Sequence, residues 1–208
     1  LWVRRRISEI NTKKHVASII ARIRRQGLQE DLRVSARISL LLKAGLDYDA
    51  ALMAEEEAGR CVREGDKHGA IDLLEQAFAI VEAHEGEVQW DTLLITVVSE
   101  LCRLRINVGR DLTGIPSLLE LERPVAVRLG DSRTLARIDL VSGLYRYVTG
   151  DSAGGLSLIS SGLQKAEELG DEDIMAISAE FRGIYYYLTG LYKEAADAFE
   201  LVMRSGSL

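Results

Sequence analysis

The sequence predicts an all-α fold, a right-handed α-solenoid of antiparallel helix hairpins, and three features support this prediction. Apolar residues recur at helical spacing almost everywhere, without the alternation that is typical of strands. Glycine stands between the apolar stretches, where helices end. The chain also repeats itself after forty residues, a period typical of solenoids, whose units bury their apolar faces against their neighbours. The repeated residues are Gly143, Tyr145, Tyr147, Thr149 and Gly150, which recur as Gly183, Tyr185, Tyr187, Thr189 and Gly190.

The helical spacing divides the chain into two predicted parts. Residues 1–47 form a basic N-terminal segment with the leading helices, and residues 48–208 form four helix hairpins. Asn11 and Thr12 mark a potential break in the first helix. The predicted helices span residues 3–25, 29–44, 48–64, 67–84, 89–108, 111–129, 132–149, 152–169, 172–189 and 192–204.

Glycine followed by aspartate marks four of the predicted joints. The pair occurs at 65–66, 130–131, 150–151 and 170–171. Glycine adopts the left-handed conformation that stops one helix, and the aspartate carboxylate then accepts hydrogen bonds from the first N–H groups of the next. Joints this short place consecutive helices antiparallel, as hairpins.

Two prolines fall inside the predicted helix at 111–129. Pro124 cannot donate a hydrogen bond to the carbonyl four residues earlier, so we expect a kink or a break there. Pro116 is compatible with the first turn of a helix, where the N–H group has no partner in any case. It therefore offers an alternative start for this helix.

Small residues recur at one place in the first helix of every hairpin. Seven residues before the turn glycines at 65, 109, 150 and 190 stand Ala58, Cys102, Gly143 and Gly183. A glycine inside a helix costs about 1 kcal/mol relative to alanine. Two glycines at equivalent places predict a helix crossing too close for a side chain.

The predicted hairpins resemble the tetratricopeptide repeats. The last hairpin carries the match at Gly183, Tyr186, Gly190, Tyr192, Ala195 and Phe199, with Ser207 where the family has a proline. The second hairpin departs from the pattern at Arg105 and Pro116. The forty-residue unit is similar to the longer variety in kinesin light chains and bacterial signalling proteins. The phrases AVRLGD and AEELGD resemble the helical tails of bacterial signalling ATPases of the STAND type.

The resemblance implies a binding groove lined by the first helix of each hairpin. Arginine and tyrosine there would suit peptide recognition, although Tyr147 and Tyr187 could instead pack between repeats. The resemblance also implies a non-enzymatic protein-interaction scaffold within a larger bacterial signalling protein. The alternative is a small-molecule sensor that controls an attached ATPase, cyclase, kinase or DNA-binding module. The groove residues would be Arg103, Asn107, Arg137, Leu144, Tyr147, Glu180, Ile184 and Tyr187.

Charge is distributed unevenly along the 208 residues, whose net charge is −6. Residues 1–43 hold 11 lysines and arginines against 3 acidic residues, and residues 44–208 hold 15 against 29. A basic segment can contact nucleic acid or an anionic surface. We favour a solvated helix face that docks on the acidic remainder of the chain or on a missing domain, because no nucleic-acid recognition motif accompanies the basic segment. Without a signal peptide or a membrane-spanning run, we expect a cytoplasmic protein.

Motifs for catalysis or for cofactor and metal binding are absent from the sequence. It has no phosphate-binding GxxxxGK[ST] loop, HExxH, CxxC or EF-hand loop. His15, His68 and His84 stand far apart, so we expect surface or capping roles for them. Cys61 and Cys102 lie within apolar helical patterns, as expected for reduced thiols. We therefore predict no catalytic residues, cofactor or metal.

The final predicted helix is rich in apolar side chains. Phe199, Leu201, Val202 and Met203 lie close together near its end. Solenoids normally close with a polar capping element, so we expect this chain to be a piece of a longer protein. An exposed apolar patch favours association. The sequence therefore predicts self-association through residues 192–204.

Overall fold

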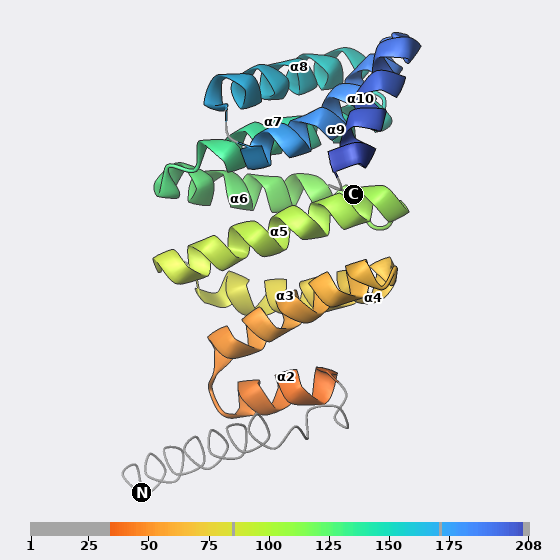
Figure 1. Cartoon of the computed structure of the whole chain (residues 1–208). Helices are drawn as coiled ribbons and strands as arrows, with labels where there is room; N and C mark the ends of the chain where they lie inside the picture. The colour runs from red at the N-terminus through yellow and green to blue at the C-terminus, as the bar shows by residue number, and fades with distance from the viewer. Residues whose placement is uncertain (1–33, 85, 171, 206–208) are drawn as a thin grey trace, which may run out of the picture. The chain divides into compact units, whose positions relative to one another are not determined.

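The computed structural model describes residues 34–84, 86–170 and 172–205, and in these ranges the chain is helical, without strands (Figure 1). The all-α prediction is therefore confirmed for the described part. The predicted helix at 3–25 and the first residues of the one at 29–44 lie outside it. The helices are α2 (Val34–Lys43), α3 (Asp47–Arg63), α4 (Lys67–Val81), η1 (Glu82–His84), α5 (Val88–Val108), η2 (Leu112–Gly114), α6 (Ile115–Leu129), α7 (Ser132–Val148), α8 (Ser152–Leu169), α9 (Glu172–Leu188) and α10 (Tyr192–Ser205).

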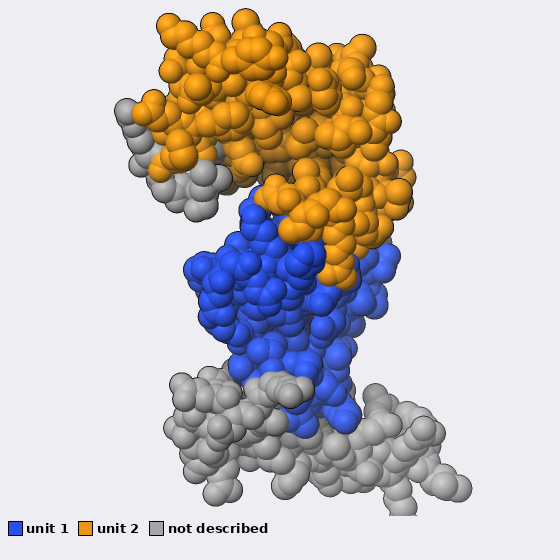
Figure 2. Space-filling view, turned by 90° about the vertical axis from the view of Figure 1, so that its right-hand side faces the viewer, with its two compact units in different colours: residues 1–104 blue, residues 105–208 orange. Residues whose placement is uncertain are grey.

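Neighbouring helices pack against one another within two compact units, residues 1–104 and 105–208, which Figure 2 distinguishes by colour. In the first unit, α3 packs against both α2 and α4. In the second unit, α7 packs against α6, α8 and α9, and α10 packs against α9. The division falls inside α5, so the second predicted hairpin has residues in both units.

The glycine–aspartate joints have the predicted geometry. Gly150 has a φ of 108°, which an L-residue with a side chain rarely adopts. Asp151 then caps α8, because its Oδ1 accepts a hydrogen bond of 3.0 Å from the N–H of Gly154. Asp66 caps α4 in the same way. The aspartate of the joint at 170–171 lies outside the described residues.

The prolines of α6 have different outcomes. Pro116 lies in the first turn of this helix, which confirms the alternative start. Pro124 does not break the helix, which continues to its end at Leu129, so the predicted break is wrong. Pro124 and Glu120, four residues earlier, are both exposed. Water can therefore hydrate the carbonyl of Glu120 that loses its helical partner.

Small side chains let α3 and α4 approach closely in the first unit. Ala50, Ala54 and Ala58 of α3 are fully or almost fully buried, at successive four-residue intervals on one face. On α4, Ile71 and Leu74 are buried as larger side chains. The pairing of small with large residues produces the core of this hairpin.

In the second unit, glycine allows the close approach of two helices, as predicted. A Cβ on Gly143 of α7 would lie 2.7 Å from the carbonyl oxygen of Gly155 in α8. A Cβ on Gly183 of α9 would lie 2.7 Å from Cε1 of Phe199 in α10. Both distances are shorter than any ordinary carbon contact, so the close crossings are confirmed.

Candidate functional site

Four of the predicted groove residues form two equivalent pairs on α7 and α9. Leu144 and Ile184 occupy equivalent positions of the forty-residue repeat, and so do Tyr147 and Tyr187. Within each helix the two residues are three positions apart and therefore share a face. Because α7 and α9 pack against each other in the second unit, the four residues lie on adjacent helices. We call them the α7–α9 surface.

The tyrosines of the α7–α9 surface differ in exposure. Tyr187 is 60% exposed, and its ring meets that of Tyr192 edge-on, with centroids 5.8 Å apart. Tyr147 is half-buried, and its backbone nitrogen lies against the position of Gly155 that lacks a Cβ. The alternative of tyrosines packed between repeats therefore does not describe Tyr187, which presents most of its ring to solvent.

Glu180 adds a carboxylate beside the α7–α9 surface. It is half-buried and precedes Ile184 by four residues, so the two share a face of α9. Ile177, seven residues before Ile184, is 37% exposed and continues the same strip. Ile177 was not among the predicted groove residues, although its seven-residue spacing from Ile184 is a signal that could have identified it.

Arg137 pairs with a buried glutamate between α6 and α7. Its Nη2 donates a hydrogen bond to Oε1 of Glu122, and the exposed fractions of the two side chains are 11% and 0%. A buried carboxylate strongly favours a cationic partner, because an uncompensated buried charge is costly. The guanidinium of Arg137 is therefore engaged inside the second unit.

A second ionic cluster joins three consecutive helices around Asp139 of α7. Arg123 of α6 donates a hydrogen bond of 2.8 Å to Oδ1 of Asp139, and Lys165 of α8 donates one to its Oδ2. Burial alone would raise the pKa of Asp139, but these hydrogen bonds and the two positive charges outweigh it and hold the pKa below its usual value. The carboxylate is thus an ionised centre that binds α6 and α8.

Neither ionic cluster was identified from the sequence, although a signal exists. Glu122 follows Leu118 by four residues and precedes Val125 by three, which places it in the buried stripe of α6. Asp139 stands between Ile138 and Leu140, which are both buried. A charge at an otherwise apolar helical position indicates a paired interior group.

Arg103 and Asn107 belong to the end of α5. Both are exposed, and the Nε of Arg103 donates a hydrogen bond of 3.1 Å to Oε2 of Glu100 on the same helix. Arg103 lies in the first unit and Asn107 in the second, together with the α7–α9 surface. The predicted groove residues are thus divided between the two units.

Of the described histidines, His84 contacts an aromatic ring and a carboxylate, and His68 is exposed. His84 stacks on the ring of Trp90, with centroids 4.2 Å apart, and lies 3.4 Å from the carboxylate of Asp47. Tyr48 meets the same Trp90 ring edge-on. His68 is exposed near the start of α4, and His15 lies outside the described residues. Among the described residues, no group of three or more histidine, cysteine, aspartate or glutamate side chains could hold a metal ion.

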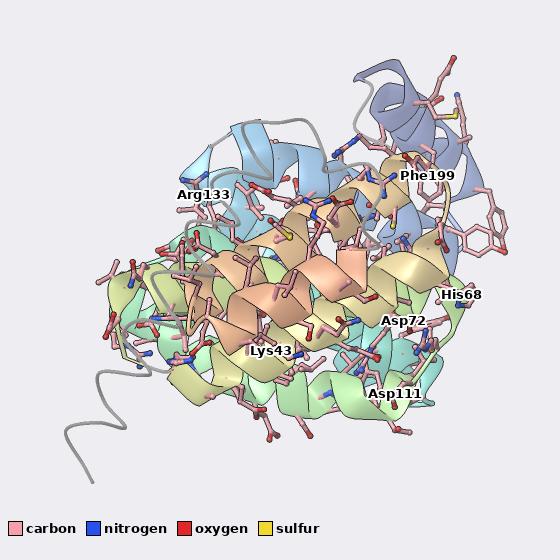
Figure 3. All side chains as sticks on the ribbon, turned by 90° about the horizontal axis from the view of Figure 1, so that it is seen from below. Lys43, His68, Asp72, Asp111, Arg133 and Phe199 are labelled. Carbon is pink, nitrogen blue, oxygen red and sulfur yellow. The ribbon has the colours of Figure 1, made fainter. Side chains whose placement is uncertain are left out.

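A hollow lies at the joint between α6 and α7. One of its lining residues, Arg133, is labelled in Figure 3. The carboxylate in this hollow, that of Asp131, accepts hydrogen bonds from the backbone N–H and the hydroxyl of Thr134 and thereby caps α7. The hollow is therefore the product of a helix joint. Its lining residues are Gly130, Asp131, Ser132, Arg133 and Leu169.

Comparison with known proteins adds no family to these observations. No protein-family model matches the chain, and no curated protein matches it. In the described part of the chain, no helix has the length and apolar character needed to cross a membrane. The candidate site is therefore defined by its geometry alone.

Proposed function

We propose that this chain is a tetratricopeptide-like, right-handed solenoid segment that binds a protein or peptide without catalysing a reaction. The observation that carries this proposal is the α7–α9 surface, where two equivalent aliphatic residues and two equivalent tyrosines lie on adjacent helices. The resemblance of AVRLGD and AEELGD to signalling-ATPase tails suggests a larger bacterial signalling protein in the cytoplasm as the setting.

The chemistry of the α7–α9 surface suits an extended or helical peptide. Leu144 and Ile184 supply partly exposed apolar area, and tyrosine adds a large ring with a polar end at a small cost in side-chain entropy. Glu180 favours a partner with a basic residue beside its apolar anchors. The two arginines among the predicted groove residues have other contacts, since Arg137 binds Glu122 and Arg103 binds Glu100.

The sensor alternative requires a pocket with apolar walls and a few convergent polar groups. The hollow at the α6–α7 joint has glycine, aspartate, serine and arginine at its walls, with Leu169 as the apolar member. Its carboxylate is already engaged in capping α7. The peptide proposal is therefore better supported by the described surface.

Selection from a phage-displayed peptide library on the whole chain tests this proposal. We expect peptides with apolar or aromatic residues and at least one basic residue. Their affinity, measured by fluorescence polarisation, should fall about tenfold or more in the Tyr147→Ala/Tyr187→Ala variant, as for interface tyrosines in general. Circular dichroism should show that this variant keeps its helical content.

Val127→Ala provides the control, because it truncates a side chain that is 62% exposed on α6. Peptide affinity should be the same for this variant and for the wild type. Failure to select any peptide, or peptides that bind the double tyrosine variant normally, would exclude the α7–α9 surface. A metabolite that raises the melting temperature of the wild type, but not of the tyrosine variant, would instead support the sensor.

A further inference from the structure

Two tyrosines meet across the joint between α9 and α10. The ring of Tyr187, in the last turn of α9, lies against the ring of Tyr192, the first residue of α10, with centroids 5.8 Å apart and planes at 65°. The chain has seven tyrosines, all within the described residues. These two are exposed, at 60% and 67%, and the other five are half-buried. An oxidant in solution therefore reaches these two most readily. We call them the tyrosine pair.

The joint holds the backbone of the tyrosine pair in place. The N–H of Gly190 donates to the carbonyl oxygen of Tyr187 at 3.2 Å, and the N–H of Leu191 donates to that of Tyr186 at 2.8 Å. The helices α9 and α10 also pack against each other (Figure 1). Exposed side chains change rotamer on the picosecond to nanosecond timescale. The two rings can therefore sample many relative orientations while their backbones stay close together.

The repeat shows that this combination belongs to the last hairpin. Forty residues earlier, Tyr147 and Ser152 stand at the two positions of the tyrosine pair, so the second ring is missing. One other contact between tyrosine rings is present, that of Tyr185 and Tyr186, with centroids 6.2 Å apart. Both of these residues are half-buried, and consecutive side chains of a helix do not face each other. Among the seven tyrosines, exposure and contact across a joint thus coincide at the tyrosine pair.

Adjacent phenols have a defined one-electron oxidation chemistry. Each phenol loses its hydroxyl hydrogen as an electron and a proton, and the resulting phenoxyl radical carries part of its unpaired electron on the ring carbons ortho to the oxygen. Two such radicals form one carbon–carbon bond between ortho carbons. The C–H bond at each joined carbon then breaks, and its hydrogen restores the hydroxyl of the same ring. The two electrons and two protons released in total reduce one molecule of hydrogen peroxide to two molecules of water.

We propose that the tyrosine pair is an oxidative modification site, at which hydrogen peroxide and a haem peroxidase join Tyr187 to Tyr192 as dityrosine. The link forms within one chain, because the hairpin presents each radical to its partner at an effective concentration on the order of millimolar. It makes the joint between α9 and α10 covalent and fixes the ring of Tyr187, which belongs to the α7–α9 surface. The modification itself does not depend on peptide binding.

Oxidation of the whole chain by hydrogen peroxide and a haem peroxidase provides the test. The wild type should develop the fluorescence of dityrosine and remain a monomer on a denaturing gel, since at about 10 µM protein coupling between chains is about a hundredfold less favoured than within a hairpin. Trypsin cleaves after Arg182 and Lys193, and the peptide of residues 183–193 should be lighter by two hydrogen atoms. This peptide has no methionine, cysteine or tryptophan, so its change in mass reports on its tyrosines.

Phenylalanine substitutions identify the two residues that are joined. Phenylalanine keeps the ring but lacks the hydroxyl hydrogen that the oxidant removes. Tyr187→Phe and Tyr192→Phe should each reduce the dityrosine fluorescence about tenfold or more, because the remaining ring has only less favoured partners. Tyr186→Phe is the matched control, because it removes a hydroxyl from the same tryptic peptide and should leave the fluorescence unchanged. Circular dichroism should show the same helical content in all three variants.

Each outcome of this experiment decides the proposal. A wild type that forms no dityrosine, under conditions that couple free tyrosine, would overturn it, and so would dityrosine confined to covalent dimers. Wild-type fluorescence in Tyr187→Phe or Tyr192→Phe would assign the link to other tyrosines. A loss in Tyr186→Phe as large as in the other two variants would contradict selective reaction of the tyrosine pair. Peptide affinity enters none of these measurements, so their failure is separate from failure of the proposed function.

Discussion

The hairpins α7–α8 and α9–α10 share one sequence pattern, yet they make their close contact differently. In α7–α8, glycine meets glycine, and a Cβ on either Gly143 or Gly155 would lie 2.7 Å from the carbonyl oxygen of the other. In α9–α10, Gly183 meets the ring of Phe199, and the position of Gly155 is taken by the buried Ala195. The first contact is backbone on backbone, and the second is ring on backbone.

This comparison shows that a repeated glycine does not fix the nature of a helix crossing. The residues of the opposite helix decide whether two backbones touch or a side chain fills the space. A backbone contact cannot relax without displacing a whole helix, whereas an aromatic ring can move through its own torsion angles. The same substitution should therefore have different consequences in the two hairpins.

Leucine at the two crossing glycines gives the largest expected effect. Overpacking a well-filled contact costs about 1–3 kcal/mol and occasionally more, and the backbone contact of Gly143 places it at the upper end. Gly143→Leu should lower the free energy of unfolding more than Gly183→Leu, as measured by urea denaturation. Equal losses in both variants would mean that the two crossings are equivalent.

The next largest effect concerns Asp139, which has no counterpart in α9, where Ala179 stands at the equivalent position. Asp139→Asn removes the charge that faces Arg123 and Lys165, and we expect a loss of about 1–3 kcal/mol. Because its pKa is held below the usual value, this stabilisation is present above about pH 4 and is lost as the pH falls through the lowered pKa. Urea denaturation at neutral and at strongly acidic pH should show the difference between wild type and variant shrinking; a constant difference would contradict the ionic role.

A double-mutant cycle sharpens the contrast between ring and backbone. Gly183→Ala gains about 1 kcal/mol of helix propensity but clashes with the ring of Phe199. In the Phe199→Ala background, Gly183→Ala should therefore become stabilising. Gly143→Ala should stay destabilising in the Ile159→Ala background, since its clash also involves the carbonyl oxygen of Gly155. Thermal denaturation of the six variants measures both coupling energies; similar coupling energies would remove the distinction.

The smallest expected effect lies at the hairpin joints. Gly150 is followed by Asp151, which caps α8, whereas Gly190 is followed by Leu191, which is 44% exposed. The two joints have the same backbone hydrogen bond. The N–H of Leu191 donates to the carbonyl oxygen of Tyr186 at 2.8 Å, and the N–H of Asp151 donates to the carbonyl oxygen of Arg146 at 2.9 Å. Leu191→Asp should supply the missing cap and stabilise the protein by about 0.5–1 kcal/mol. An unchanged melting temperature would show that the α10 terminus is already satisfied.

The elements with local signals were predictable from the sequence. Gly150 and Asp151 specify a helix stop and a cap through their own conformational preferences, so the joint was found without knowledge of its neighbours. Gly143 likewise indicated a crossing. The nature of that contact was not predictable, because it depends on which residue of the partner helix lies opposite.

Arg137 and Pro124 have surroundings that local rules did not indicate. Arg137 was assigned to a groove by its position in the repeat, yet Glu122 of the preceding helix binds it. Pro124 was expected to kink or break a helix, and the helix does not break: α6 keeps its helical conformation on both sides, with the proline exposed. At Arg137 a contact with the preceding helix overrides the local rule, and at Pro124 the helical sequence on both sides of the proline does.

The Asp139 cluster has a consequence for how the second unit opens. Helix α6 cannot leave α7 without removing Arg123 from the largely buried carboxylate of Asp139. Opening of α6, α7 and α8 is therefore coupled, and their slowest amide protons should exchange with solvent deuterium at one common rate. Helix α10, held at Gly183 by a ring, can open alone and should exchange faster.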